Sequence, residues 1–294
     1  MNIVMLGHSQ AGKTTYMALM YGTLNSGSYG FEVLCQDRAQ HKHLLRAAQA
    51  VLRGDYPPPT DHRQVYDLKL RHGLSDLVDF RWRDHRGGAL TERSTSQQSA
   101  DLRRDLLAAD ALVVFVDAYE LIATPRGARK VRTLMAPITA ALADRTTFVP
   151  LVISLTKCDL LGEDHDTGRL NSAFDPLINA VRQSPYVYGT IVELACGPRP
   201  RNIVGPVLFC LYWAIAKRAE ELDNEIESAM QQAAMYQAQN HLMGRWLAAW
   251  RGEPHPGHSA AEMLGRAQAQ YAQLEPLIEP GQKLEELLDE LPVF

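Results

Sequence analysis

The stretch that decides the fold is Gly7-His8-Ser9-Gln10-Ala11-Gly12-Lys13-Thr14, which fits the pattern G-x-x-x-x-G-K-[ST] at every fixed position. An apolar run at residues 3–6 precedes it and predicts a buried strand, while residues 14–20 predict the first turns of a helix. The glycines let successive backbone N–H groups face one concavity, and the helix N-terminus adds partial positive charge. The stretch therefore predicts a cradle for a polyphosphate.

Within this cradle, Lys13 would reach the β and γ phosphates as a point charge. The hydroxyl of Thr14 would be a ligand of the Mg²⁺ that bridges those phosphates. His8 is expected to face solvent rather than the phosphates. The residues expected to contact the phosphates are Gly7, Ser9, Gln10, Ala11, Gly12, Lys13, Thr14 and Thr15.

Composition excludes several classes of protein. The 294 residues include 30 Lys and Arg against 34 Asp and Glu, which gives a net charge of -4 with no long run of one sign. This balance argues against nucleic acid as a partner. The four cysteines lie far apart and form no C-x-x-C spacing, so neither disulfides nor a zinc site is expected.

The sequence also predicts where the protein acts. The phosphate-binding strand begins at residue 2, which leaves no room for a signal peptide before it. The longest apolar stretch, residues 203–216, is too short to span a bilayer and predicts a buried helix. We therefore expect no membrane span and a cytoplasmic location.

Strands and helices are expected to alternate through the first two thirds of the chain. A helix capped by Asp37 should end near Arg53, and two strands should form an antiparallel hairpin around Gly73. Further strands are expected at residues 31–34, 111–117, 148–155 and 187–194, and further helices at 91–109, 126–143 and 170–182. This order predicts an α/β fold, a P-loop NTPase domain with a mainly parallel central sheet and helices on both faces.

The pattern changes near Leu208, where a heptad seam begins. Its positions are Leu208, Tyr212, Ile215, Ala219, Leu222, Ile226, Ala229, Ala233, Tyr236, Asn240, Met243, Leu247 and Trp250. A break at residues 254–257 precedes a second helix with Met263, Leu264, Ala267, Tyr271 and Leu274 on one face, and four leucines follow Pro280-Gly281. We expect a nucleotide domain at 1–218 and a C-terminal helical extension at 219–294. The helices could pack on their own domain or offer a coiled-coil surface to a partner, so the oligomeric state stays open.

A second motif follows the hairpin. Asp84 ends an apolar strand, and the carboxyl ends of such strands present ligand-binding groups. Its carboxylate could hold a metal-bound water, and the N–H of Gly87 could meet the γ phosphate, since only glycine lets the backbone come that close. The alternative for this D-x-x-G tetrapeptide is a surface turn.

A third motif, Thr156-Lys157-Cys158-Asp159, follows a buried strand. A carboxylate at Asp159 can accept hydrogen bonds from the N1–H and the amine of guanine, whereas adenine offers no such pair of donors. The stem of Lys157 could lie over the base plane. Backbone N–H groups at Ala195 and Cys196, after the last strand, could bind the guanine O6.

Together these motifs resemble the Ras-like, translation-factor-related class of P-loop GTPases, and more loosely the bacterial double-GTPase type found beside partner genes in conflict and signalling systems. The resemblance covers residues 7–197. It implies bound GTP or GDP, a Mg²⁺ cofactor, and loops that order around the γ phosphate and relax after hydrolysis. It also implies a protein partner, an effector or regulator, that contacts the switch loops and the C-terminal helices.

The chain departs from this class in several places, one of which is the cradle, where Ser9 and Gln10 stand in place of glycines and would narrow the space around the γ phosphate. The switch I threonine that binds Mg²⁺ normally follows the first helix closely, whereas the candidate here is Thr60, with a simple turn threonine as the alternative. Gly88 stands where many relatives have a glutamine that orients the attacking water. His85 could position water and Arg86 could neutralise transition-state charge, or both could be exposed residues without a catalytic role.

Three functions are consistent with the sequence. The first is a GTP-hydrolysing switch in which Lys13, Thr60, Asp84, His85 and Arg86 act in catalysis. The second is a GTP-binding scaffold that hydrolyses little, because of Gly88. The third is a P-loop small-molecule kinase, which would need an arginine-bearing lid and would have no use for Asp159 as a guanine reader.

Overall fold

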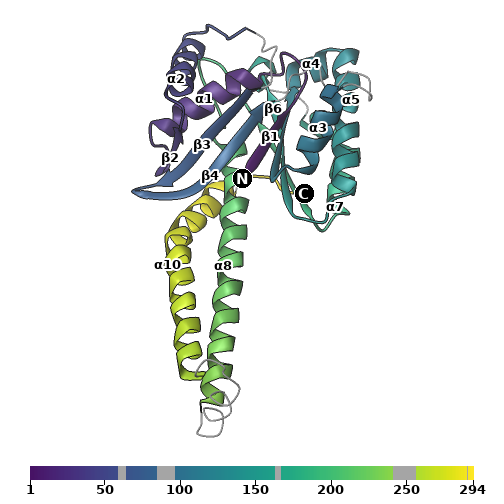
Figure 1. Ribbon diagram of the computed structural model, residues 1–294. Coiled ribbons are helices and arrows are strands. Elements are labelled where there is room, and N and C mark those ends of the chain that lie inside the picture. The colour runs from purple at the N-terminus through teal and green to yellow at the C-terminus, as the bar shows by residue number, and fades with distance from the viewer. Residues whose placement is uncertain (59–63, 85–96, 163–166, 241–255, 290) are drawn as a thin grey trace. The chain divides into compact units, whose positions relative to one another are not determined.

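The computed structural model describes residues 1–58, 64–84, 97–162, 167–240, 256–289 and 291–294. A seven-stranded sheet, in the order β2-β3-β4-β1-β5-β6-β7, lies in a compact unit of residues 1–213 and 286–294 (Figure 1). The strands are β1 (Asn2–Leu6), β2 (Phe31–Cys35), β3 (Gln64–His72), β4 (Ser75–Asp84), β5 (Ala111–Asp117), β6 (Val149–Thr156) and β7 (Val187–Glu193). β4, β1, β5, β6 and β7 run parallel, and β3 runs antiparallel to β2 and β4. The predicted mainly parallel sheet and its hairpin are confirmed.

The register of the parallel strands brings their carboxyl ends to one edge of the sheet. Met5 is the partner of Asp84 on β4, and Asp117 on β5 is the partner of Thr156 on β6. The residues that follow β1 are those of the phosphate cradle. Pairing of neighbouring strands therefore places the three predicted motifs together, as expected for a parallel α/β sheet.

Helices cover both faces of the sheet (Figure 1). They are α1 (Lys13–Asn25), α2 (Arg38–Leu52), α3 (Gln97–Leu107), α4 (Ala118–Ala123), α5 (Pro125–Ala143), α6 (Thr167–Ser172) and α7 (Asp175–Arg182), with a 3₁₀ turn, η2 (Cys158–Leu160). Helix α8 (Gly205–Gln239) begins in the same unit, whose first stretch ends at Trp213. Helices α3, α5 and α7 bury Leu106, Leu134 and Leu177 in one core with the strands. On helix α1, the ring of Tyr16 packs against Trp82 and Phe115 at centroid distances of 6.1 and 4.9 Å. Burial of these apolar side chains holds the helices to the sheet.

Local signals explain several helix ends. The side chain of Asp37 accepts a hydrogen bond from the Gln40 N–H at 2.7 Å, so the predicted N-cap of α2 is confirmed. The helix expected to begin near residue 126 begins at Pro125, and a separate helix, α4, precedes it. The helix expected at 170–182 is two helices, because Pro176 starts a new N-terminus in α7. Residues 91–96 of another predicted helix lie outside the described residues.

Residues 214–285 form a second compact unit, in which α8 continues and α10 (Pro256–Leu288) runs alongside it (Figure 1). The two helices run antiparallel (Figure 1), and Arg218 donates a hydrogen bond to the side chain of Gln273 at 3.2 Å. The buried seam positions on α8 are Leu208, Ile215, Leu222, Ala229 and Ala233, and those between them are partly buried. On α10 the buried residues are Ala260, Met263, Ala267, Leu277, Pro280 and Leu284.

Parts of the heptad prediction are wrong. Helix α8 ends at Gln239, so Asn240 follows the helix rather than interrupting it, and seam positions 243–250 lie outside the described residues. Leu264 and Tyr271 are exposed rather than on the buried face. α10 also continues through Pro276 and Pro280, because the seam on both sides of these prolines outweighs the two missing N–H groups.

The last residues of the chain extend the sheet at the β7 edge. The N–H of Phe294 donates to the Gly189 carbonyl at 2.9 Å, and the Gly189 N–H donates to the Phe294 carbonyl at 3.0 Å. A Cβ atom on Gly189 would lie 2.3 Å from the Phe294 ring, so a larger residue there would displace that ring.

Among the described residues, no helix has the length and apolar character needed to cross a membrane.

Candidate functional site

The phosphate cradle has the backbone that its glycines predict. Gly12 has φ 84°, and Gln10, with φ 67°, is one of few residues other than glycine in the left-handed region. A Cβ atom on Gly7 would lie 2.7 Å from the Phe115 carbonyl oxygen. The start of the loop therefore presses directly on β5, where a larger residue would displace it.

Thr156 supports the loop from behind. Its side chain is fully buried, and its hydroxyl lies 2.9 Å from the Ala11 carbonyl and 3.1 Å from the Val116 carbonyl. The hydroxyl can donate to either acceptor, so it ties the loop to the ends of β5 and β6. Thr156 thus helps to fix the backbone conformation of the cradle.

Lys13 and Asp84 form a buried charged pair at the mouth of the cradle. The Lys13 ammonium donates to the Gly7 carbonyl at 3.0 Å and lies 3.8 Å from Asp84 Oδ1, too far for a hydrogen bond. Asp84 is 3% exposed, and its Oδ1 has no hydrogen-bond partner among the described residues. Burial raises the pKa of Asp84 to about 6 and lowers the pKa of Lys13, while each opposes the shift of the other.

Several predicted site residues fall where nothing is described. Thr60, His85, Arg86, Gly87 and Gly88 lie outside the described residues, so their expected roles stay predictions. Within the described ranges, no three His, Cys, Asp or Glu side chains gather as metal ligands. Mg²⁺ takes only one or two protein ligands and keeps several waters, so such a cluster is not required for it.

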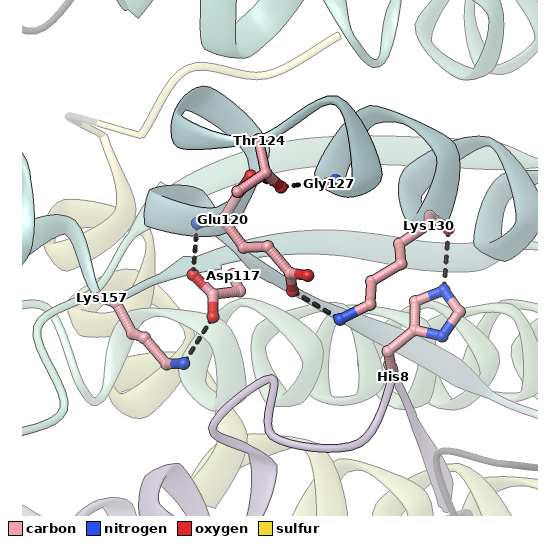
Figure 2. A network of polar contacts seen from close by, with 7 residues as sticks. All are labelled: His8, Asp117, Glu120, Thr124, Gly127, Lys130 and Lys157. Atoms are coloured by element: carbon pink, nitrogen blue, oxygen red, sulfur yellow. Dashed lines mark hydrogen bonds and ion pairs between the residues drawn. The ribbon is translucent and has the colours of Figure 1, made fainter.

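Lys157 is held by an ion pair with Asp117, as Figure 2 shows. The Lys157 ammonium lies 2.5 Å from Asp117 Oδ2, while Asp117 Oδ1 accepts from the Glu120 N–H at 2.8 Å and caps α4. One carboxylate therefore starts a helix and fixes the lysine of the third motif. Lys157 itself has φ 60°, which turns the chain toward η2.

His8 does not face solvent alone, and this expectation is corrected. Its Nε2–H donates to the Lys130 carbonyl on α5 at 2.8 Å (Figure 2). The Lys130 ammonium in turn lies 2.6 Å from Glu120 Oε2 on α4. Burial lowers the pKa of His8. The imidazole thus links the cradle to α5.

Asp159 lies on η2 and is exposed, with its carboxylate beside the loop after β7. A Cβ atom built on Gly197 would lie 3.7 Å from Asp159 Oδ2 and 3.1 Å from the Tyr56 hydroxyl. Burial, and next the Asp159 charge, raise the pKa of Cys196 to about 12. The Ala195 N–H donates to the Arg201 carbonyl at 3.2 Å. The third motif and the last loop are therefore neighbours.

With the three motifs at one sheet edge, comparison with known proteins decides the family. Residues 2–183 match the sequence profile described as Double-GTPase 2. The chain belongs to the Double-GTPase 2 family. The resemblance to Ras-like P-loop GTPases is confirmed, and membership of this family supports GTP and GDP as the bound nucleotides. Among curated proteins, none matches the sequence.

Solved structures similar to this Double-GTPase 2 chain include the following three. The signal recognition particle receptor SRβ-GTP/SRX complex of Chaetomium thermophilum is 13% identical, with 66% of this chain and 90% of that chain covered and a TM-score of 0.39. Arl6 of Trypanosoma brucei, with a bound nucleotide analogue, is 15% identical over 67% and 87%, with a TM-score of 0.38. The GTP-bound GTPase-like domain of Ski7 from S. cerevisiae is 14% identical over 67% and 42%, with a TM-score of 0.41.

Sequence reasoning missed the contribution of β5 to the site. Asp117 directly follows an apolar run, as Asp84 does, so the rule for strand carboxyl ends would have found it. Its position before residues 118–123 is also an N-cap signal. No local signal identifies the bond between His8 and Lys130, which are 122 residues apart.

Replacing Asp84 by Asn should stabilise the nucleotide-free Double-GTPase 2 protein at alkaline pH. Because the pKa of Asp84 is raised from 3.8 to about 6, its protonated form favours folding below pH 3.8, and that contribution is lost as pH rises through 6. The free energy of unfolding of Asp84→Asn should exceed that of the wild type by up to about 3 kcal/mol at pH 8. Urea unfolding of both proteins at about pH 4 and about pH 8 measures this difference in the free energy of unfolding. A variant less stable than the wild type at the higher pH would contradict this.

Replacing Asp117 by Asn should weaken binding of GTP and GDP by the same factor, about fivefold. Asn can still cap α4, but it loses the charge that holds Lys157. Titration of each nucleotide measures the two affinities, with Asp144→Asn as the control, since Asp144 is an exposed residue at the end of α5. Unchanged affinities, or a loss confined to GTP, would contradict a role for Asp117 in holding Lys157 against the guanine base, which GTP and GDP share.

Proposed function

We propose that this protein binds Mg-GTP, hydrolyses it to GDP and phosphate, and uses the change to regulate a protein partner. The observation that carries the proposal is the buried carboxylate of Asp84, whose Oδ1 has no hydrogen-bond partner in the described part of the chain and lies 3.8 Å from the Lys13 ammonium. A buried charge without full hydrogen bonding is costly for folding alone. A ligand that supplies both a cation and phosphate oxygens would give Asp84 a positive partner and Lys13 a negative one.

The residues at the cradle fit a magnesium ion. Asp84 Oδ1, which has no partner among the residues that the structure describes, offers an acceptor for a metal-bound water, and Thr14 follows Lys13 in the first turn of α1. Thr60 is the proposed third contact. When bound, Mg²⁺ would neutralise charge on the β and γ phosphates. Lys13 would then exchange its bond to the Gly7 carbonyl for phosphate oxygens.

Guanine is the proposed base because of Asp159. Its carboxylate lies beside Gly197, at the loop where the purine edge would sit, and Lys157 is held next to it by Asp117. The two carboxylate oxygens can accept from the two donors of guanine, whereas with adenine they would be left without donors. Because the Ala195 N–H is already bonded to Arg201, the amide for the guanine O6 falls to Cys196 or Gly197.

Hydrolysis needs an oriented water, and the chain has Gly88 where relatives use glutamine. We propose that His85 positions the water and that Arg86 neutralises developing charge, with the Gly87 N–H on the γ phosphate. Loss of that phosphate would release the segments around Thr60 and residues 84–88. In the proposed division of labour, residues 1–218 hold the nucleotide and the helices of 219–294 engage the partner, within a bacterial signalling or conflict system.

Two measurements on the full chain test the proposal. In a single-turnover assay, bound GTP should be hydrolysed faster than free GTP. Asp159→Ala should weaken GTP binding by about 5- to 150-fold, the equivalent of 1–3 kcal/mol for an unmatched hydrogen-bonding site, and leave the affinity for ATP unchanged. Asp223→Ala on the exposed face of α8 is the control and should bind GTP as the wild type does.

The two alternatives give different results. Tight GTP binding with a rate no faster than free GTP, even with the partner present, would indicate a scaffold. A preference for ATP that Asp159→Ala leaves unchanged would indicate a small-molecule kinase. Either outcome would overturn the proposed GTPase switch.

A further inference from the structure

A hollow of about 670 Å³ lies between the start of the phosphate cradle and helix α5. Its walls are His8, Ser9 and Gln10 on one side, and Pro125, Arg126, Arg129, Lys130 and Thr133 on the other. In the cradle, Ser9 and Gln10 come before Lys13, the residue with which α1 begins. If the proposed nucleotide lies along the loop, this is the end toward the terminal phosphate.

The wall formed by α5 is fixed firmly to the cradle. The bond from His8 to the Lys130 carbonyl joins the two directly, and the Lys130 side chain is paired with Glu120 (Figure 2). A Cβ atom on Gly127 would lie 2.2 Å from the Glu120 carbonyl oxygen, so α4 and α5 meet in backbone contact. The side chains on this part of α5 therefore keep their place relative to Ser9 and Gln10.

Two positive charges in this wall have no acidic partner within the described ranges. Glu120 offsets the charge of Lys130, whereas Arg126 and Arg129 are exposed and form no ion pair with an acidic side chain of the described residues. Arg132, on the next turn of α5, does not line the hollow, and its Nε–H donates to the Ala128 carbonyl at 3.4 Å. A basic helix face is ordinarily only solvated. Here two of its arginines share a hollow with the phosphate loop.

We propose that Arg126 and Arg129 make the site selective for the triphosphate over the diphosphate, an inference that rests on the proposed function. GTP differs from GDP by the charge of its terminal phosphate, which would lie at the Ser9 end of the loop. For an assumed separation of about 10 Å through solvent with a dielectric constant close to that of water, each cation favours that extra charge about two- to threefold. The two arginines together give about a fivefold to tenfold preference at low salt.

The experiment measures the affinities of the full chain for a non-hydrolysable GTP analogue and for GDP, with Mg²⁺, by calorimetric titration. Arg126→Ala with Arg129→Ala should lower the ratio of the two affinities about five- to tenfold in low salt, and the effect should shrink at high salt because the charges are screened. The double lysine variant should keep the ratio, since it keeps the charges. Arg132→Ala is the matched control and should behave as the wild type.

Outcomes against the inference differ from outcomes against the function. If the wild type binds both nucleotides but the double alanine variant changes both affinities equally, or if Arg132→Ala has the same effect, the inference is wrong and the proposed function stands. If the folded wild type binds neither nucleotide, the proposed function is wrong and the inference falls with it. All variants change exposed side chains, and circular dichroism checks that they fold.

Discussion

Two opposite charges buried side by side at the edge of the sheet are the constraint on which the rest depends. The parallel pairing of β1 with β4 places Asp84 beside the strand that leads into the cradle, and Lys13 returns to the same point from the first turn of α1. Neither charge is fully satisfied by the described residues, because Lys13 bonds to a neutral carbonyl and Asp84 Oδ1 has no donor. Buried charges that are incompletely paired cost free energy, and a bound polyphosphate with its cation would supply the missing partners.

The walls around this pair are built before any ligand arrives. Gly7 presses on the Phe115 carbonyl, Thr156 holds the Ala11 carbonyl, and His8 reaches α5. On the base side, Asp117 fixes Lys157 through an ion pair at the ends of neighbouring strands. Groups held in this way bind a ligand with little loss of conformational freedom, because packing and hydrogen bonds have already ordered them.

The sequence predicted most of the fold where the signal is local. The cradle motif, the Asp37 cap and the hairpin around Gly73 each depend on a few consecutive residues, and the strands of the parallel sheet are short apolar runs. Contacts set by strand register could not be read in this way, and the pair of Asp117 with Lys157 is an example. The helices after residue 205 show a different limit of prediction from sequence. Proline is a strong local signal for the end of a helix, yet Pro276 and Pro280 lie inside α10. Packing along the buried seam outweighs that local signal.

The most direct test of the account is a crystal structure of the full chain with Mg²⁺ and a non-hydrolysable GTP analogue. The account predicts the Asp159 carboxylate within hydrogen-bond distance of the guanine N1 and its amine. It also predicts that the Lys13 ammonium has left the Gly7 carbonyl for the phosphates, and that Asp84 faces a metal-bound water. A nucleotide bound elsewhere, or an Asp159 side chain directed away from the base with Lys13 still on Gly7, would contradict it.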